Sequence, residues 1–455
     1  MFNVFEYLRD GSKSAKIHFV GIGGVGMYSL ARLALKAGAS VSGSDRCEGE
    51  YTADLSAHGC KIFIPHTAKS ITRDIDAVVY SHAIVRDNLE LLAARDMGIR
   101  TYSRSELLGL VMKQYSERIG ISGTHGKSTV CAMVAHIFKV VGLDPTVASG
   151  APIDGRLPFL DGGEEYFIYE ACEYRDSFLD LYPTSVVVTN IDLDHTDYFP
   201  SIEEYKGSFL KCINRAESVS VLNIDDPNIR ALLPLIESEV ITVGTTSVAD
   251  FSYSPYSFLE DGIIYSLSRN NKLLGRFKMG LVGEFNLANA ALAIATASAH
   301  GIDPKAAAEA LESFKGVKRR CEPLGSYGGR TVYYDYAHHP TEIRAVINAL
   351  RACSGALTVI FTPHTYTRTR DLWDGFISAL SLADFVIITD IFAAREAPIE
   401  NVTSKRLAEA IGERAFYSDS NRIRDILDAK ALGNIVVMGA GENTEILSLL
   451  LSKNG

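Results

Sequence analysis

The chain has 455 residues, which suits about three domains of ordinary size. Its formal net charge is −10, and this acidic balance argues against a general nucleic-acid binder, whose surface would be basic. The seven cysteines form no C-x-x-C pair, so we expect neither a zinc cluster nor a redox motif, and unpaired thiols suit a reducing cytosol. Residues 1–6 lack a signal-peptide pattern and no apolar run approaches ~18 residues, so we predict a cytoplasmic protein.

The first part of the chain alternates short apolar strands with helices. A strand is predicted at 17–20, and a helix follows at about 27–37 and stops at Gly38. Further strands are predicted at 40–44, 61–64 and 77–81. Because strands that alternate with helices form parallel sheets with right-handed crossovers, we expect a Rossmann-like domain over residues 1–112.

The middle of the chain repeats this alternation. Its first strand, 118–122, leads into a helix over about 129–141, and an Ala-rich helix at about 287–300 closes the block. Further strands are predicted at 166–170, 185–189 and 218–223. Tyr, Phe and Gly turns make 239–280 typical of a β-meander. We expect a central P-loop-type ATPase domain with a mostly parallel sheet over 113–316.

The last part of the chain is a third block of strands and helices. One of its helices is opened by Pro340, at a first-turn position where the missing N–H costs nothing. Strands are predicted at 331–335, 357–362, 385–390 and 434–438. We expect a C-terminal Rossmann-like α/β domain over 317–455, so the whole chain is predicted to be an α/β protein of three domains.

A first glycine-rich loop follows the first predicted strand. Gly21, Gly23 and Gly26 fit G-x-G-x-x-G, and Asp45 follows at the distance of a ribose-binding acid. Such glycines let the backbone approach a diphosphate at a helix N-terminus. The pattern suits a dinucleotide or another nucleotide diphosphate such as a UDP-sugar, and the alternative is a tight turn without a ligand.

A second glycine-rich loop lies between a strand and a helix in the middle of the chain. It reads Gly123-Thr124-His125-Gly126-Lys127-Ser128-Thr129, with Ile121 where a standard P-loop has glycine. Backbone N–H groups and Lys127 can still hold ATP phosphates, and Ser128 or Thr129 can coordinate Mg²⁺. Two phosphate loops predict two phosphorylated ligands, which argues against a simple dehydrogenase.

Charged side chains follow several of the later predicted strands, where α/β sheets hold their ligands. Glu170 and His195 are candidates for a Mg²⁺ shell around ATP. Arg320 could neutralise a transferring phosphoryl group, and Arg368 could hold a substrate carboxylate through a bidentate contact. The neighbours His338 and His339 are a poor metal pair, so we predict a substrate or capping role for this run.

Over essentially its whole length, the chain resembles the Mur ligases of peptidoglycan synthesis. The resemblance is carried by residues 17–27, 42–45, 123–129, 189–191 with 194–195, 316–320, 335–342, 363–369 and 393–396. It is most similar to members that join L-alanine to UDP-N-acetylmuramate. It implies an ATP-dependent, amide-forming ligase of cell-wall biogenesis that acts through an acyl phosphate and uses ATP and Mg²⁺. We expect a monomer or weak homodimer without nucleic-acid or membrane partners.

The resemblance also implies the roles of individual residues. The sugar nucleotide would be bound by Gly23, Gly24, Gly26, Met27, Asp45, His66 and Ser81. ATP would be bound by Gly123, Thr124, His125, Gly126, Lys127, Ser128, Thr129, Asn286, Asn289, Arg320 and Asp335. Mg²⁺ would be bound by Ser128, Glu170 and His195, and alanine by Tyr336, His338 and Arg368. Catalysis would depend on Lys127, His195, Arg320 and His338. Phe285 stands where the family usually has histidine, which weakens the adenine contact at that position.

Other functions remain open on the sequence. A recycling ligase would attach a whole tripeptide to the same sugar nucleotide. A nicotinamide-dependent dehydrogenase would use only the first glycine loop, and a non-catalytic nucleotide-binding module would use neither loop for chemistry. The set of Lys127, Glu170, His195 and Arg320 argues against the last alternative.

Overall fold

The computed structural model describes residues 14–451 except for 154, 156, 260–261, 395, 420–421 and 442. The chain divides into two compact units. The first consists of Met1–Ile191, Tyr205–Val243 and Leu292–Ala307, and the second of Asp192–Glu204, Gly244–Ala291 and Ala308–Gly455. No helix among the described residues is long and apolar enough to cross a membrane.

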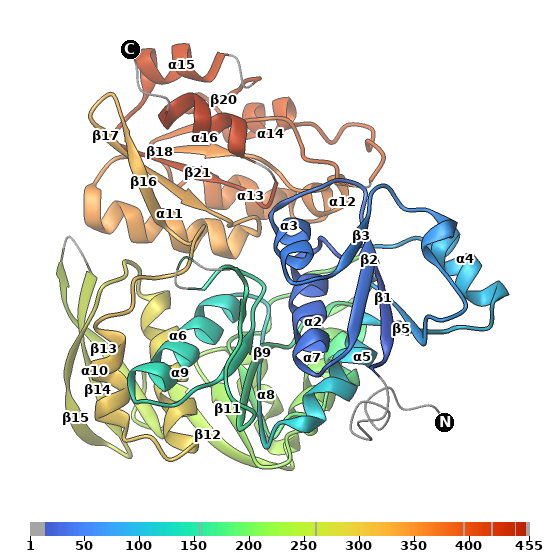
Figure 1. The fold of residues 1–455 in the computed structure, drawn as a ribbon. Coiled ribbons are helices and arrows are strands. Elements are labelled where there is room, and N and C mark those ends of the chain that lie inside the picture. The colour runs from blue at the N-terminus through green and yellow to red at the C-terminus, as the bar shows by residue number, and fades with distance from the viewer. Residues whose placement is uncertain are drawn as a thin grey trace. The chain divides into compact units, whose positions relative to one another are not determined.

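The N-terminal part of the first unit is built on a parallel sheet (Figure 1). Its strand order is β3-β2-β1-β4-β5, so the direction of strand addition reverses between β1 and β4. The strands are β1 (Lys16–Val20), β2 (Ser40–Ser44), β3 (Lys61–Phe63), β4 (Ala77–Tyr80) and β5 (Arg100–Ser103). The helices are α2 (Val25–Lys36), α3 (Glu50–Ala57), α4 (Leu89–Asp96) and α5 (Arg104–Val111). A doubly wound sheet of this order holds ligands at the carboxyl ends of its strands, near the reversal.

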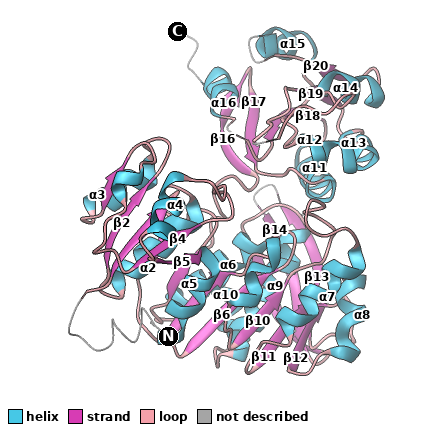
Figure 2. Ribbon diagram, turned by 90° about the vertical axis from the view of Figure 1, so that its right-hand side faces the viewer, coloured by secondary structure: helices cyan, strands magenta, loops and turns pink. Residues whose placement is uncertain are grey.

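A second sheet of the first unit follows β5 and α5 in the chain (Figure 2). Its strands follow the order β12-β11-β10-β6-β9-β7-β8. They are β6 (Glu117–Ser122), β7 (Thr146–Ala148), β8 (Phe159–Leu160), β9 (Tyr166–Glu170), β10 (Ser185–Val188), β11 (Val219–Asn223) and β12 (Glu239–Gly244). The helices beside this sheet are α6 (Lys127–Val140), α7 (Ile202–Ile213), α8 (Pro227–Leu232) and α9 (Phe285–Ala299), and the first unit includes α7 from Tyr205 and α9 from Leu292. All pairs are parallel except β7 with β8.

The second unit contains an antiparallel meander and a mostly parallel sheet. The meander is β13 (Phe251–Leu259), β14 (Gly262–Arg269) and β15 (Lys272–Met279), and α10 (Pro304–Leu311) follows α9. The sheet has the order β16-β17-β21-β18-β19-β20, with only β16 antiparallel to its neighbour. Its strands are β16 (Glu322–Tyr327), β17 (Arg330–Asp335), β18 (Leu357–Phe361), β19 (Phe385–Ile388), β20 (Ala415–Tyr417) and β21 (Asn434–Met438). Its helices are α11 (Pro340–Ser354), α12 (Tyr366–Asp371), α13 (Trp373–Leu380), α14 (Ser404–Ile411), α15 (Ile423–Lys430) and α16 (Thr444–Leu451).

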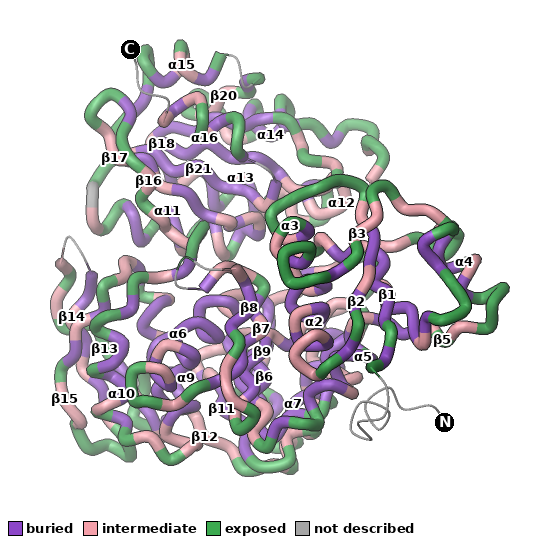
Figure 3. The backbone as a smooth tube through the Cα atoms, in the orientation of Figure 1, coloured by how far each residue is buried: buried purple, intermediate pink, exposed green. Residues whose placement is uncertain are grey.

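The cores lie on the faces of these sheets (Figure 3). In the C-terminal sheet, one cluster joins α11 and α13 to one face, and another joins α15 and α16 to the opposite face. Val359 belongs to the first cluster and its neighbour Ile360 to the second, because successive strand residues point to opposite faces. This two-sided burial explains why the central strands are continuous apolar runs.

The predicted α/β class is confirmed, and most predicted strands agree within a residue or two. The prediction of a meander over 239–280 is wrong at its beginning, because β12 pairs in parallel with β11. Helices α2 and α6 each begin two residues earlier than predicted. The predicted domain limits at 112 and 316 stay predictions.

Candidate active site

The first glycine loop is closed onto the end of β2. Gly21 has a φ of 82°, and the N–H groups of Gly21 and Ile22 donate to Ser44 O at 2.8 and 2.9 Å. Gly23 N donates to Asp45 Oδ2 at 2.8 Å, and a Cβ on Gly23 would lie 2.8 Å from the same oxygen. The loop therefore needs glycine at these positions and brings the predicted partners Gly23 and Asp45 together.

The loop leads into α2, whose first turn can offer free N–H groups to an anion. Gly24 is the N-cap, and the first turn contains no acidic residue. Among the predicted ligand residues, Met27 has a side chain that belongs to the core, with 2% of the residue exposed. Any contact of Met27 with a diphosphate would therefore use its main chain.

Two further residues predicted for the sugar nucleotide follow β3 and β4. His66 Nδ1 lies 2.7 Å from Ser44 Oγ, so His66 is tied to the residue that closes the glycine loop. Ser81 follows β4, and its Oγ accepts from Ala83 N at 3.3 Å. His66 is thereby placed beside the first loop, whereas Ser81 caps its own turn.

Arg104 lies beside the first loop although the sequence did not single it out. A Cβ on Gly26 would lie 3.2 Å from Arg104 Cδ and 3.3 Å from Arg104 Nη1. A guanidinium at this point adds positive charge where a diphosphate is expected. The signal in the sequence is its place directly after β5, at the carboxyl edge of the sheet.

The second glycine loop is held by the residues that follow β10. Gly123 has a φ of 126°, and a Cβ there would lie 2.0 Å from Thr189 Oγ1. His125 N donates to Asn190 Oδ1 at 2.9 Å. Gly126, with a φ of 85°, is the N-cap of α6. The loop thus passes from strand to helix as a P-loop does, despite its incomplete glycine pattern.

Lys127 is the first residue of α6 and folds back over the loop. Its Nζ donates to Gly123 O and, at 3.0 Å, to Thr124 O. Glu173, which is 2% exposed, places Oε2 at 3.0 Å and Oε1 at 3.1 Å from the same nitrogen. Burial alone would lower the pKa of Lys127, but the acidic groups around it, Glu173 first and then Cys172 and Glu170, together outweigh burial and raise it. The ammonium therefore stays charged, and Glu173 is a partner that sequence reasoning missed.

The predicted magnesium ligands of the first unit lie at the ends of neighbouring strands. Glu170 is the last residue of β9 and pairs with Ile121 of β6, just before the phosphate loop. Its Oε1 accepts from Ser149 Oγ at 2.9 Å. Ser128 lies in the first turn of α6 and is 8% exposed. A hydroxyl and a carboxylate are the oxygen donors that Mg²⁺ prefers, so these side chains suit that ion.

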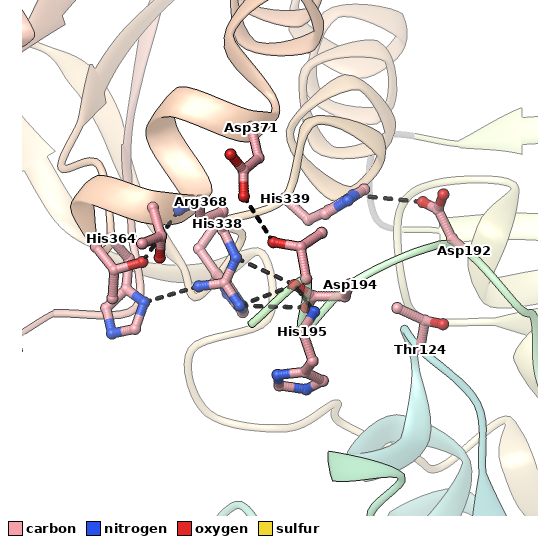
Figure 4. Close-up of polar contacts among 12 residues, drawn as sticks. Thr124, Asp192, Asp194, His195, His338, His339, His364, Arg368 and Asp371 are labelled. Carbon is pink, nitrogen blue, oxygen red and sulfur yellow. Dashed lines mark hydrogen bonds and ion pairs between the residues drawn. The ribbon is translucent and has the colours of Figure 1, made fainter. Parts of the chain in front are cut away.

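In the second unit, Arg368 is already paired with a carboxylate (Figure 4). Its Nη2 donates to Asp194 Oδ1 at 3.0 Å and to Oδ2 at 3.2 Å, and its Nη1 lies 2.8 Å from His364 Nδ1. Burial would raise the pKa of Asp194, but Arg368, His195 and His338 hold it well below its usual range. A substrate carboxylate would therefore compete with Asp194 for this guanidinium.

His195, the third predicted magnesium ligand, belongs to the second unit. Its backbone lies in the left-handed region with a φ of 53°, and its N–H donates to Asp194 Oδ1 at 2.8 Å. Asp194 thus fixes the backbone of His195 and the guanidinium of Arg368 together.

His338 is held in one orientation by its neighbours. Its Nδ1 lies 3.0 Å from Tyr336 O, and its ring contacts those of Tyr336 and His364 with centroids 5.4 and 5.8 Å away. Burial is the largest influence and lowers the pKa of His338 to about 4. The ring is neutral at pH 7, so Nδ1 donates to the carbonyl and Nε2 carries a lone pair.

The neighbouring histidine has the capping role predicted for this run. His339 is the N-cap of α11, its Nδ1 accepts from Thr341 N at 3.3 Å, and Pro340 occupies the first turn. His339 Nδ1 also lies 3.3 Å from Asp192 Oδ2.

Asp335 and Arg320, both predicted for ATP, meet different partners. Asp335 is 3% exposed, and its two oxygens accept from Cys321 N and Ala337 N, each at 2.7 Å. Burial raises its pKa despite the nearby charge of Arg320. Arg320 Nη1 lies 3.6 Å from Glu342 Oε1. Asp335 thus holds the backbone just before β16 and just after β17, and Arg320 lies beside Glu342 and the ring of Tyr336.

The predicted adenine ligands lie in the first turns of α9. Asn286 Nδ2 donates to Val282 O at 2.8 Å, and Asn289 Nδ2 lies 3.3 Å from Asn286 Oδ1. Both residues are buried, at 6% and 7% exposure. Their amides are therefore partly committed to the start of the helix.

Family models match the chain in three consecutive segments. "Mur ligase family, catalytic domain" matches residues 16–116, "Mur ligase middle domain" matches 121–297, and "Mur ligase, glutamate ligase domain" matches 319–446. The chain belongs to the Mur ligase family. Both glycine loops and the histidine-arginine cluster of the second unit lie within the matched segments.

Curated relatives and solved structures agree with this family. A UDP-N-acetylmuramate–L-alanine ligase of Caldicellulosiruptor bescii is 37% identical over 451 residues, covering 96% of this chain and 98% of the relative. One of Anaeromyxobacter dehalogenans is 39% identical over 455 residues, covering 96% and 98%. The structure of a UDP-N-acetylmuramate–alanine ligase from Thermotoga maritima has a TM-score of 0.80 and 27% identity, covering 96% of this chain and 100% of that one. A murein peptide ligase from Psychrobacter arcticus, at a TM-score of 0.73 and 24% identity over 97% of this chain and 100% of that one, shares the fold.

Proposed function

We propose that this Mur ligase joins L-alanine to the lactyl carboxylate of UDP-N-acetylmuramate, with cleavage of ATP to ADP and phosphate. The observation that carries the proposal is the full-length similarity to curated ligases of that specificity at 37–39% identity. The two phosphate loops support it, because the reaction needs a nucleoside-diphosphate sugar and a nucleoside triphosphate. The reaction belongs in the cytoplasm, where ATP is available.

The chemistry follows from the weak electrophilicity of a carboxylate. A carboxylate oxygen attacks the γ-phosphorus of ATP, the bond to the bridging oxygen breaks, and ADP leaves. The amine of alanine then attacks the carbonyl carbon of the acyl phosphate, inorganic phosphate leaves, and the nitrogen loses a proton. Positioning and charge neutralisation supply most of the catalysis in phosphoryl transfer.

Lys127 and Arg320 are proposed to neutralise the phosphate charge. Lys127 stands at the N-terminus of α6, where backbone N–H groups also face an anion. Ser128, Glu170 and His195 would hold Mg²⁺, which would supply further neutralisation of the triphosphate. Asn286, Asn289 and Asp335 complete the proposed ATP-binding set.

Alanine is assigned to the cluster of the second unit. Arg368 would bind its carboxylate in place of Asp194, through the same two-oxygen geometry. His338 would accept the amine proton on Nε2, because Nδ1 is committed to Tyr336 O. Tyr336 supplies the backbone carbonyl and a ring that borders the site.

The direct test is release of inorganic phosphate from ATP by the purified chain. We expect release only when UDP-N-acetylmuramate and L-alanine are both present, and at least a 100-fold lower rate in Lys127→Ala. Absence of release from the folded wild-type protein with both substrates and Mg²⁺ would refute the proposal.

The tripeptide-recycling alternative is tested in the same assay. L-alanine and the tripeptide L-alanyl-γ-D-glutamyl-meso-diaminopimelate are compared as acceptors at equal concentration. We expect alanine to have the higher kcat/KM. A higher kcat/KM for the tripeptide would show that the protein is a recycling ligase instead.

A further inference from the structure

A buried carboxylate lies beneath the first glycine loop and has no role in the proposed reaction. Glu90, in the first turn of α4, is 0% exposed. One of its oxygens, Oε2, accepts from Ser44 Oγ at 2.5 Å, and the other, Oε1, accepts from Ser70 Oγ at 2.6 Å. Buried carboxylates are uncommon unless they are paired, so this one needs an explanation.

Glu90 is ionised at neutral pH. Burial would raise its pKa, but hydrogen bonds with His18, Ser44 and Ser70 outweigh burial and lower the pKa to about 2. An ionised carboxylate only accepts hydrogen bonds. The groups in hydrogen-bonding contact with its oxygens must therefore supply the hydrogens.

This requirement fixes the hydrogen position on His66. His66 Nδ1 lies 3.0 Å from Glu90 Oε2 and 2.7 Å from Ser44 Oγ. The single hydroxyl hydrogen of Ser44 is used at 2.5 Å on Glu90, so Nδ1 must carry the hydrogen of this contact. In the neutral ring, Nε2 then carries a lone pair.

The free nitrogen of His66 is available to a ligand. The side chain is 17% exposed, and Nε2 has no partner among the residues that the structure describes. Ser44 connects it to the first loop, because Ser44 O accepts from Gly21 N and Ile22 N. Ser44 thus connects the loop backbone, the Glu90 carboxylate and the His66 imidazole through hydrogen bonds.

We propose that Glu90 is a positioning residue of the sugar-nucleotide site, which holds His66 with Nδ1 protonated so that Nε2 accepts a hydrogen bond from the nucleoside. The inference rests on the proposed function, since it takes the first loop as the sugar-nucleotide site. The recognised group carries an N–H or O–H, which in a uridine nucleotide is the imide N–H of the base or a ribose hydroxyl. A cytosine base has no N–H at the corresponding ring position.

The test uses His66→Asn in the full chain, because an asparagine amide N–H can replace Nδ1 toward Glu90 but offers nothing in place of Nε2. We expect the affinity for UDP to fall about 10-fold, the loss of one well-placed hydrogen bond, while the melting temperature and the affinity for ADP stay unchanged. His58→Asn is the matched control, since His58 lies on the exposed end of α3 with 43% of its side chain exposed. Unchanged UDP affinity in a folded His66→Asn variant would overturn the proposal.

Analogues identify the donor on the nucleoside. N3-methyl-UDP lacks the imide N–H, and 2′-deoxy-UDP and 3′-deoxy-UDP each lack one ribose hydroxyl. The analogue that lacks the recognised donor should bind the wild type about 10-fold more weakly than UDP does. The His66→Asn variant should bind this analogue and UDP with equal affinity. If no analogue shows this coupling to His66, the inference fails.

The role of Glu90 is tested through the ring hydrogens. Nitrogen-15 NMR of the wild type should show His66 protonated on Nδ1 and unprotonated on Nε2. In Glu90→Gln, the same spectrum should show a mixture of tautomers. This variant should also have a raised KM for the sugar nucleotide and an unchanged KM for ATP. A wild-type spectrum with the hydrogen on Nε2 would contradict the proposal. Phosphate release by the wild type with alanine tests the proposed function separately. Failure of the proposed function is therefore distinguishable from failure of the inference about Glu90 and His66.

Discussion

At the scale of single residues, two of the three cations predicted to bind ATP or alanine are each paired with a buried carboxylate of the protein. Lys127 is paired with Glu173, and Arg368 is paired with Asp194. Such pairs keep a charged group folded into the interior, because an isolated buried charge would be costly. An incoming phosphate or carboxylate therefore exchanges one anionic partner for another, and its affinity depends on the internal partner.

Removing the internal partner of Lys127 should strengthen nucleotide binding. In Glu173→Gln the lysine loses its competing anion, and the phosphates lose a nearby negative charge. We expect the Kd for ADP, measured by calorimetry, to fall about 3- to 10-fold. Lys127→Ala serves as the opposite control, with weaker binding. Weaker ADP binding by a folded Glu173→Gln protein would show that the carboxylate assists the lysine instead.

The partly buried His364 should make stability depend on pH below neutrality. The pKa of His364 is lowered from 6.5 to about 4, mainly by burial and then by the nearby Arg368 and His338. The unfolded chain then binds a proton between these values that the folded chain does not, so stability falls as the pH drops from about 6.5 to 4. The contribution is at most about 2–3 kcal/mol, since the ring is partly solvated. Thermal melts of His364→Gln should show a smaller loss over that range than wild type, and an equal loss would contradict the assignment.

Residues of the site that the sequence identified are those whose role is local. Gly23, Asp45 and Lys127 stand in short motifs, and the structure brings Gly23 and Asp45 together as a motif requires. Glu90 and Arg104 stand in no short motif, and their partners near the first loop lie far along the chain. Only folding brings α4 and α5 to the end of β2 and the start of α2.

At the scale of elements, the phosphate loop is determined by backbone geometry more than by side chains. Gly123 combines a φ in the left-handed region with an approach to Thr189 that leaves no space for a Cβ. Ile121, where a standard P-loop has glycine, is instead part of β6. The preceding strand and the following helix fix its ends, and residues 189–190 fix its middle.

Alanine at Gly123 should therefore damage the loop more than alanine at another left-handed glycine. Gly123→Ala would place a methyl group 2.0 Å from Thr189 Oγ1, whereas a Cβ on Gly142, with a φ of 89°, meets nothing within 4 Å. We expect Gly142→Ala to cost about 1 kcal/mol, from backbone strain alone. Gly123→Ala should cost at least about 2 kcal/mol more in urea unfolding and abolish measurable ADP binding. Equal costs would show that the loop can relax.

The sequence was less informative about where helices and strands begin and about which strands pair. The strand at 239–244 directly precedes the meander and is predicted as part of it, yet it pairs in parallel with β11. Strand direction depends on the neighbour that supplies hydrogen bonds, and composition does not encode this choice.

At the scale of the whole molecule, the first unit contains two sheets joined by close packing. Helix α5 ends the first predicted domain and lies against the 3₁₀ segment Tyr174–Asp180 of the next one. Ser105 Oγ donates to Asp180 Oδ2 at 2.6 Å, and a Cβ on Gly109 would lie 2.2 Å from Asp180 O. The small residue lets two backbones touch, which explains why the predicted domains 1–112 and 113–316 share one compact unit over much of their length.

Filling this contact should loosen the first unit. Gly109→Ala is expected to lower the free energy of unfolding by about 1–3 kcal/mol, although alanine favours a helix, because the added methyl group has no space. Gly207→Ala is the matched control in α7, where a Cβ meets nothing within 4 Å, and it should be neutral or stabilising by up to about 1 kcal/mol. Urea denaturation of both variants measures the difference, and a stabilised Gly109→Ala would contradict the close packing.

The sequence by itself determined the α/β class, the two phosphate loops and the family, because each depends on local periodicity and on short motifs whose backbone demands are strict. The tertiary structure alone decided which acids pair with Lys127 and Arg368, the network of Glu90 with His66, and the direction of β12. These features depend on segments that are distant in the chain and meet only when the sheets bury their faces, and no local pattern records such meetings.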